Sequence, residues 1–347
     1  MKKDTKRYGT YITLIVLISA NILLGFFLIR MRTVTNSGDP AGGGRTYDAR
    51  YAFICEDSED DLYAAVYDSA KLVGEENGDY VEFMGRDLSV IYSPEDLMDA
   101  SVEAGMDGII VESAVSDRMN ELIDRAVDKG IPVVALGTDQ TASKRNAYVG
   151  CAYYSVGQTF GSRIVSLSGD EVKNVTVLMT KEKENSNHDI IFSGIKNYIE
   201  SAGLSQNFSL TAEFIDDSQP YGAEESISAL MGRDEIPDVI ICLQETATTC
   251  ACQSLVDMNR VGETDIIGFY VNDTILSAIK DGVLLGTVVM DAETMGKYCI
   301  ETLDNFRENG VVNEYMPVNT YVIDGNNVDD FIEEAVGDND GTKSADQ

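Results

Sequence analysis

The sequence predicts an α/β protein with parallel sheets flanked by helices, preceded by one transmembrane helix. Over roughly 250 residues, short apolar runs alternate with helical patterns of about 10–15 residues, which is typical of βαβ units. Ahead of them, the run from Ile12 to Ile29 carries no charged residue. The chain has 347 residues, of which 44% are hydrophobic, and this is enough for two domains with cores of their own.

The N-terminal apolar run has the length of a membrane span. Residues 8–29 form 22 uncharged residues, about 33 Å as a helix. Four basic residues precede the run and two follow it, which places the N-terminus in the cytoplasm. We therefore expect a cytoplasmic tail (1–7), a transmembrane anchor (Tyr8–Ile29) and a flexible linker (30–47). A cleaved signal peptide is the alternative, but no Ala-x-Ala site follows the run.

The charge of the chain is divided between its two parts. Residues 1–32 hold six basic residues and one acidic residue, whereas residues 33–347 hold 20 basic and 58 acidic residues. Such acidity argues against nucleic acid as a partner, because binding to nucleic acid depends on a basic surface that neutralises phosphates. It also argues against a body that lies on anionic lipid headgroups.

The elements follow one another in a regular order after the linker. Apolar runs predict strands, in chain order, at Tyr51–Cys55, Val81–Met84, Ile109–Val111, Ile131–Leu136, Val175–Met179, Leu210–Ile215, Val239–Leu243, Asp265–Tyr270 and Leu284–Met290. Helical spacing, with caps such as Ser93-Pro94, predicts helices at Leu62–Val73, Ser93–Ala104, Ser116–Asp128, Ile190–Ser201, Ala223–Met231, Thr246–Asn259, Thr274–Lys280 and Ala292–Glu308. The polar, acidic residues 337–347 are expected to be a disordered tail. Periodicity alone leaves two architectures open, a (β/α)8 barrel and two doubly wound domains.

Several blocks of sequence decide between these architectures. They are Ala104–Val111, Ala126–Val134, Ala147–Gly150 with Gly157 and Gly161, Pro237–Cys242, Ile266–Phe269, Lys280–Gly282 with Gly286–Val288, and Met295-Gly296. In this order they resemble the type I periplasmic substrate-binding proteins, the ribose- and galactose-binding group, which are related to the ligand-binding domain of lactose-repressor-type regulators. The resemblance covers about residues 48–325. It implies two Rossmann-like lobes joined by a three-strand hinge, with lobe one at 48–150 plus 291–320 and lobe two at 151–290 plus 321–336.

The resemblance also implies which positions contact a ligand between the lobes. They are Asp60, Tyr63, Asp139, His188, Asp189, Glu245, Tyr270, Met290 and Asp291. Several depart from the family pattern: Asp60 replaces an Asn, Gly137 and Tyr270 each replace an Asp, and Met290 replaces a Gln. Tyrosine rings can pack against the C–H faces of a sugar, and carboxylates can accept from its hydroxyls.

This departure leaves two interpretations of the site. Acids and tyrosines can form a cleft for a cationic or amine-bearing ligand, because buried carboxylates need a compensating charge or hydrogen bonds. Alternatively, the cleft has lost its ligand and the domain binds protein partners. Because the chain is so acidic, each of these acids can also be an ordinary solvated surface residue. The apolar residues can likewise be ordinary core residues.

Enzyme, metal and cofactor functions are not expected. The chain has one histidine and none of the common nucleophile, phosphate-loop or dinucleotide motifs. The chain has six cysteines. A disulfide from Cys242 to Cys250 or Cys252 is possible in an oxidising compartment, and the sequence leaves open whether it forms.

The sequence therefore predicts a membrane-anchored solute-binding protein with its binding domain outside the cytoplasm, extracellular or periplasmic. The resemblance implies a sugar or similar small polar ligand, delivered to the permease of an uptake transporter or sensed with a sensor histidine kinase. A ligand-independent protein-interaction module is the alternative.

Overall fold

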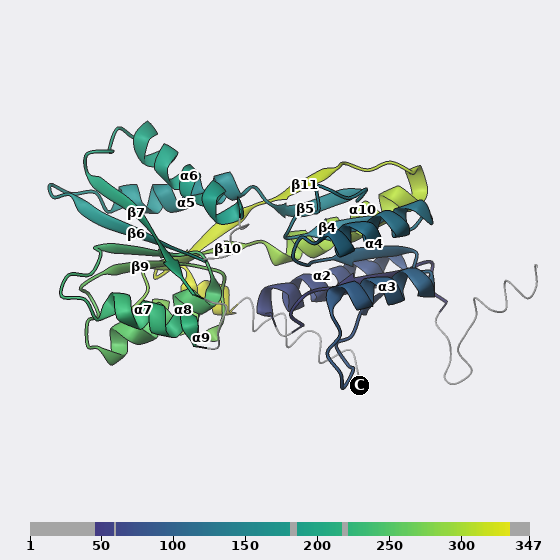
Figure 1. Ribbon diagram of the computed structural model, residues 1–347, viewed down its shortest axis with the longest axis horizontal. Coiled ribbons are helices and arrows are strands. Elements are labelled where there is room, and N and C mark those ends of the chain that lie inside the picture. Colours follow the sequence, from purple (N-terminus) through teal and green to yellow (C-terminus); the bar gives the residue numbers. More distant parts are fainter. Residues whose placement is uncertain (1–45, 59, 181–185, 217–220, 334–347) are drawn as a thin grey trace, which may run out of the picture. The chain divides into compact units, whose positions relative to one another are not determined.

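The computed structural model describes residues 46–58, 60–180, 186–216 and 221–333 (Figure 1). From Asp48 on, the described residues belong to one compact unit. The predicted cytoplasmic tail, the transmembrane anchor, most of the linker and the acidic tail lie outside the described residues. Among the helices of the described residues, none has the length and apolar character needed to cross a membrane.

Lobe one is built on a parallel sheet with the strand order β11-β5-β4-β3-β1-β2 in the described part of the chain. Its strands are β1 (Arg50–Ile54), β2 (Tyr80–Phe83), β3 (Gly108–Val111), β4 (Val133–Leu136), β5 (Ala147–Cys151) and β11 (Tyr315–Val318). Its helices are α2 (Asp61–Asn77), α3 (Pro94–Ala104), α4 (Asp117–Asp128) and α10 (Ala292–Asn309).

Lobe two repeats this plan with the order β12-β10-β9-β8-β6-β7, in which β12 runs antiparallel to β10 and the other neighbours in the described residues are parallel. Its strands are β6 (Lys173–Thr180), β7 (Phe208–Ile215), β8 (Val239–Cys242), β9 (Asp265–Phe269), β10 (Gly286–Met290) and β12 (Thr320–Asp324). Its helices are α5 (Tyr153–Ser166), α6 (Ser186–Ser201), α7 (Gly222–Met231), α8 (Glu245–Asp257) and α9 (Asp273–Lys280). Figure 1 shows α5 and α6 on one side of this sheet and α7, α8 and α9 on the other.

The alternation of side chains along each strand divides the core into layers. In β1, Tyr51 and Phe53 pack in the cluster that contains the buried faces of α2 and α10, whereas Ala52 and Ile54 pack with α3 and α4. Because successive strand residues point to opposite faces, a strand that is covered on both faces must be apolar throughout. This explains the short, unbroken apolar runs that predicted the strands.

Three short crossings connect the lobes. Single residues separate β5 from α5 (Ala152), β10 from α10 (Asp291) and β11 from β12 (Asn319). The Asp291 N–H donates to the carbonyl oxygen of Asn319 at 3.2 Å, which ties two of the crossings together. The predicted two-lobed α/β fold with a three-strand hinge is therefore confirmed, and the barrel alternative is wrong, because two open sheets replace one closed one.

Each sheet has a point at which the strand order reverses. In lobe one it lies between β1 and β3, and in lobe two between β6 and β8. The helices that follow the strands on either side of such a point cover opposite faces of the sheet, so the loops diverge and leave space at the carboxyl ends of these strands. Open α/β sheets bind their ligands there.

Two helices differ from the sequence prediction. Helix α2 continues to Asn77, beyond the predicted Val73, and ends where Gly78 adopts a φ of 87°; its last turn is largely exposed, so no apolar spacing marks it. Helix α5 is absent from the prediction. Its glycines, Gly157 and Gly161, have low helix propensity, but α6 packs closely against both.

Candidate functional site

The carboxyl ends of β1 and β3 place three polar side chains beside the reversal point of lobe one. Asp60 is the N-cap of α2 and accepts from the Tyr63 N–H at 3.1 Å. This cap fixes Tyr63 in the first turn of α2. Glu112, the residue after β3, is 8% exposed and accepts from the Glu56 N–H at 2.9 Å. Burial raises the pKa of Glu112 to about 7, and the charges of Glu56 and Asp60 raise it as well.

Gly137, the residue after β4, brings two further tyrosines to the same region. Its carbonyl oxygen accepts from the Tyr148 hydroxyl at 2.8 Å and from the Tyr153 hydroxyl at 3.0 Å. Tyr148 lies in β5 of lobe one, whereas Tyr153 begins α5 of lobe two. The second bond therefore connects the two lobes directly.

Lobe two contributes residues that follow β8 and β9. Tyr270 has a φ of 69°, a conformation that is uncommon for an aromatic residue and that marks functional or strained positions. Two bonds to β10 hold it there: its N–H donates to the Val288 carbonyl at 2.9 Å, and its carbonyl accepts from the Thr287 hydroxyl at 2.6 Å. Glu245, the first residue of α8, accepts from the Asn272 side-chain amide at 2.6 Å.

These side chains form one electrostatic group, which we call the tyrosine–carboxyl cluster. Its members are Asp60, Tyr63, Glu112, Tyr153, Glu245 and Tyr270. Burial raises the pKa of the Tyr63 and Tyr270 hydroxyls well above the usual value, and the charges of Glu112 and Asp60 raise it further. Burial also raises the pKa of Glu245, with a contribution from Asp60 of the other lobe. Burial raises the pKa of the Tyr153 hydroxyl as well, so all three tyrosines remain protonated, neutral hydrogen-bonding groups near pH 7.

Four of the residues predicted from the sequence meet in this cluster: Asp60, Tyr63, Glu245 and Tyr270. Two other predicted acids are engaged elsewhere. The Arg145 guanidinium pairs with both carboxylate oxygens of Asp139. Asp291 caps α10, where it accepts from the Thr294 N–H at 2.9 Å and from the Thr294 hydroxyl at 2.7 Å.

The remaining predicted residues lie at the ends of β10 and β6. The Met290 side chain is 2% exposed and packs in the core. His188, in the first turn of α6, is buried, and its Nδ1 accepts from the Thr180 N–H at 3.4 Å. Its neighbour Asp189 is exposed. The described contacts do not bring these residues into the tyrosine–carboxyl cluster.

The sequence prediction missed Glu112 and Tyr153. Glu112 follows β3 directly, and Tyr153 comes two residues after β5. The rule that ligands bind at the carboxyl ends of strands could have found them. Glu112 was missed because the chain has 59 acidic residues, and nothing in the sequence distinguishes a buried acid from an exposed one.

The chemistry of the cluster is that of a binding site. Its members offer phenol rings for packing against apolar faces, hydroxyls that donate and accept, and carboxyls that accept. Within the described ranges, no group of His, Cys, Asp or Glu side chains is arranged to hold a metal ion. All six cysteines are free thiols, so the disulfide from Cys242 that the sequence left open does not form in this structure.

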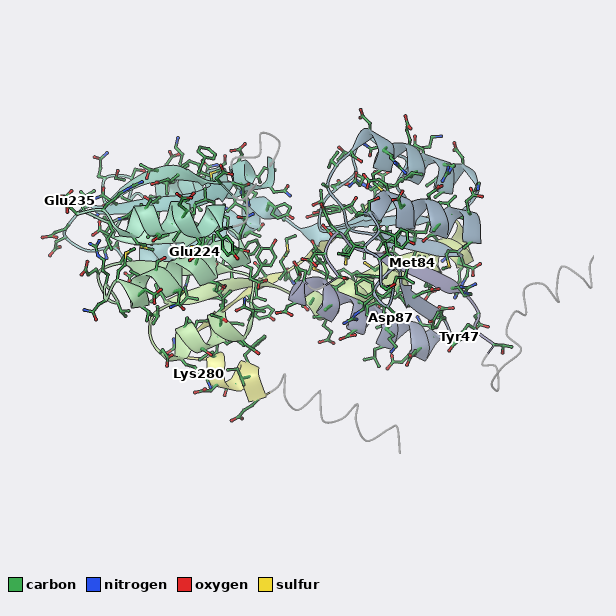
Figure 2. All side chains as sticks on the ribbon, turned by 60° about the horizontal axis from the view of Figure 1, so that its bottom comes forward. Tyr47, Met84, Asp87, Glu224, Glu235 and Lys280 are labelled. Carbon is green, nitrogen blue, oxygen red and sulfur yellow. The ribbon has the colours of Figure 1, made fainter. Side chains whose placement is uncertain are left out.

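A separate groove of about 900 Å³ lies in lobe one, away from the carboxyl end of β3. Residues of α2, β2, α3 and the loop after β2 line it. Met84 and Asp87, labelled in Figure 2, belong to that loop. Further along the loop several apolar residues are exposed, and the Ile91 side chain is 99% exposed.

Comparisons with known proteins agree with this architecture. The family model of the periplasmic binding protein domain matches residues 51–309. A search of the curated proteins gives no match. Among solved structures, the glucose-galactose binding protein GanP from Geobacillus stearothermophilus is 19% identical, with a TM-score of 0.70, over 81% of this chain and 99% of that chain.

Two other solved structures are similar over the same region. A solute-binding protein of an ABC transporter from Agrobacterium vitis, with bound D-fucose, is 19% identical, with a TM-score of 0.68, over 81% of this chain and 97% of that chain. A chain of the XylFII–LytSN complex is 24% identical, with a TM-score of 0.67, over 81% of this chain and 99% of that chain. With two α/β lobes, a three-part crossing and a family match over most of its length, the chain belongs to the periplasmic binding protein domain family.

Proposed function

We propose that the chain is a membrane-anchored, extracytoplasmic solute-binding protein that takes a sugar or a similar small polar ligand between its lobes. The observation that carries this proposal is the tyrosine–carboxyl cluster. It draws on both lobes, and its members Asp60, Glu112 and Glu245 follow β1, β3 and β8, strands that flank the points where the strand order reverses. Family membership and the sugars named for GanP and the Agrobacterium vitis protein support a sugar as the ligand.

Binding and closure are linked in this proposal. The lobes are connected by three short crossings, at Ala152, Asp291 and Asn319, so hinge motion at these residues changes the distance between lobes. A ligand that contacts Tyr63 on one lobe and Tyr270 on the other has more contacts in the closed form. It therefore shifts the population toward that form.

The electrostatics of the cluster restrict the ligand. In the described residues, the hydrogen bonds and main electrostatic neighbours of Asp60, Glu112 and Glu245 include no lysine or arginine. Anionic ligands such as sugar acids and sugar phosphates would meet uncompensated negative charge and should be excluded. An amine would be favoured, so an amine-bearing ligand is the second candidate.

A thermal-shift panel on the purified full chain tests the proposal. We expect D-galactose, L-arabinose, D-fucose, D-tagatose or D-galactosamine to raise Tm, because a ligand that binds only the folded state stabilises it by RT ln(1 + [L]/Kd). D-Galacturonate, the anionic counterpart of D-galactose, should leave Tm unchanged. A flat response to the whole panel would contradict the proposal and favour the ligand-independent interaction module.

In this proposal, residues 8–29 anchor the chain in a membrane. The partner is another protein in the same membrane. A tether raises the effective concentration of the binding domain at a partner in the same membrane. An uptake permease and a sensor histidine kinase are the two partners that fit. The similarity to a chain of the XylFII–LytSN complex supports a protein partner. Crosslinking in membranes, followed by identification of the captured protein, distinguishes the permease from the kinase.

A further inference from the structure

Strand β2 forms one edge of the lobe one sheet, and part of its backbone faces away from that sheet. Among the described strands its neighbour is β1 alone. The N–H groups of Tyr80 and Met84 donate to carbonyl oxygens in and beside β1, each at 2.9 Å. Because alternate residues of a strand point their backbone groups to opposite edges, those of Val81 and Phe83 point outward. No hydrogen bond within the described residues occupies the N–H or the carbonyl of Phe83.

The groove of about 900 Å³ lies along this open edge. Residues of β2 line it, together with residues of α2, of α3 and of the loop after β2. Helices α2 and α3 pack on opposite faces of the sheet. An extended chain beside β2 would therefore lie between two helices, with its backbone level with the outward groups of Val81 and Phe83.

The two edges of this sheet differ in their protection. At the opposite edge, β11 contains Pro317, whose nitrogen carries no hydrogen and cannot pair with an added strand. Proline and lysine are common protective residues on edge strands, and the four residues of β2 include neither. The β2 edge is therefore open to pairing.

The loop after β2 presents apolar side chains to solvent at the end of the groove. The Leu88, Val90 and Tyr92 side chains are about half exposed, and the Ile91 side chain is 99% exposed. Leu88 and Tyr92 also line the groove. Met84 and Asp87, at the start of this loop, are labelled in Figure 2. A contiguous apolar segment of this kind marks an interaction site.

The charge of the groove favours a basic occupant. Six acids and two bases line it. Four of the acids pair with bases that lie outside the lining, across exposed surface where ion pairs are weak. Asp68 and Asp87 have no ion pair within the described residues, and the Arg86 guanidinium lies over the Phe83 ring, 5.1 Å from its centroid. A second copy of the chain, its acidic tail or an anionic lipid would all bring like charge to this groove.

We propose that β2, the groove and the loop after β2 form a docking surface for an extended segment of a partner protein, in which apolar and basic residues alternate. The segment adds to the sheet as a strand beside β2 and pairs with the outward groups of Phe83. Its apolar side chains pack against Ile91 and its neighbours, and its basic side chains meet Asp68 and Asp87. This inference goes beyond the proposed function, because it needs no small ligand and no member of the tyrosine–carboxyl cluster lines the groove.

Three synthetic peptides test the strand addition by fluorescence anisotropy on the full chain in a neutral detergent. The probe has four Lys-Val repeats, and we expect it to bind. Four Glu-Val repeats should not bind, because their charge is opposite. The Lys-Val peptide with every backbone nitrogen methylated keeps its charge but has no N–H donors, so it should bind about 10-fold more weakly or worse. Failure of the Lys-Val peptide to bind, or equal binding of all three, would overturn the inference.

Substitutions on the docking surface test its place. Asp68→Lys combined with Asp87→Lys should weaken the Lys-Val peptide about 10-fold, while Asp170→Lys with Glu171→Lys, the same change at exposed acids of lobe two, stays within about 3-fold. Ile91→Ser should weaken it about 5-fold or more, and Val172→Ser, at a 60% exposed valine of lobe two, should have little effect. Equal effects of the surface variants and their controls would contradict the proposal.

Hydrogen exchange locates the bound peptide. We expect the Lys-Val peptide to slow amide exchange in residues 80–84 several-fold. Protection that is confined to other segments would place the peptide elsewhere and overturn the inference. A dimer of the full chain that Ile91→Ser converts to a monomer in sedimentation would make a second copy the occupant and would also overturn it. Since these tests use no sugar, their failure leaves the proposed function standing.

Discussion

At the residue scale, the site is made of ionisable groups whose environment the tertiary structure sets. Glu112 and the chain's many other acids have the same side-chain chemistry, but burial at the end of β3 raises the pKa of Glu112 to about 7. The family resemblance indicated Tyr63 and Tyr270, and the structure brings them into one electrostatic group. The properties of the tyrosine–carboxyl cluster therefore come from where its side chains lie in the fold more than from their residue types.

Glu112 should make stability depend on pH. Its pKa rises from 4.5 to about 7 on folding, so the folded chain holds this proton over a range in which the unfolded chain has lost it. The resulting stabilisation is fully present below pH 4.5 and is lost as the pH rises through 7. We expect Glu112→Gln, which stays neutral, to gain up to roughly 3 kcal/mol of unfolding free energy over wild type between about pH 4 and pH 8.

Urea denaturation of wild type and Glu112→Gln at several pH values measures this difference. Asp189→Asn is the matched control, because Asp189 is an exposed acid. Its difference from wild type measures the effect of removing one exposed acid. A Glu112→Gln difference that changes with pH no more than this control does would contradict the raised pKa of Glu112.

At the scale of elements, the helices that follow the hinge crossings pack through glycines. A Cβ on Gly157 of α5 would lie 2.2 Å from the Ile191 carbonyl oxygen of α6, and a Cβ on Gly296 of α10 would lie 2.4 Å from the Val66 carbonyl oxygen of α2. Both pairs of helices therefore approach backbone to backbone. The two lobes use the same device beside the hinge, although the sequence pattern marked these glycines only through a family resemblance.

Gly157→Ala should destabilise lobe two by overpacking. The added methyl group meets backbone atoms of α6, which cannot rotate away, so we expect a loss of about 2–3 kcal/mol in the free energy of unfolding. Gly169→Ala, with nothing within 4 Å of its Cβ, is the control and should change little. Equilibrium denaturation checks both variants. Equal stabilities for the two would mean that α5 and α6 are not in close contact.

Asp291→Ala separates a capping role from a ligand-binding role. Asp291 accepts two hydrogen bonds from Thr294 at the start of α10, so its loss should cost about 1 kcal/mol of stability, as for a typical N-cap. Ser93→Ala removes the cap of α3, far from the hinge, and should cost a similar amount. If Asp291 only caps α10, the affinity for a sugar that binds wild type stays within about 3-fold. A larger loss of affinity, with unchanged stability, would show that Asp291 contacts the ligand.

At the scale of the whole molecule, charge and hydropathy divide the chain into two environments. The basic, apolar N-terminal residues suit a membrane and its cytoplasmic face, whereas residues 33–347 carry 58 acids and only 20 bases. Anionic headgroups would repel so acidic a body, in keeping with the membrane-anchored function that we propose.

Protease treatment of spheroplasts tests this topology. With epitope tags at both ends, we expect added protease to remove the C-terminal epitope and to leave a short N-terminal fragment protected. A cytoplasmic protein of the same cell, probed in parallel, controls for lysis. Protection of the C-terminal epitope until detergent is added would place the lobes on the cytoplasmic side and contradict the proposal.

The sequence by itself determined the α/β class and most strands, because a strand covered on both faces has to be apolar throughout. The resemblance of ordered sequence blocks to a known family indicated the two lobes, and it also indicated Asp60, Tyr63, Glu245 and Tyr270. Only the tertiary structure decided the rest. It pairs Asp139 with Arg145, gives Asp291 to a helix cap and buries Glu112 beside Glu56 and Asp60. These outcomes depend on which residues meet across the fold, and no local pattern in the chain encodes that.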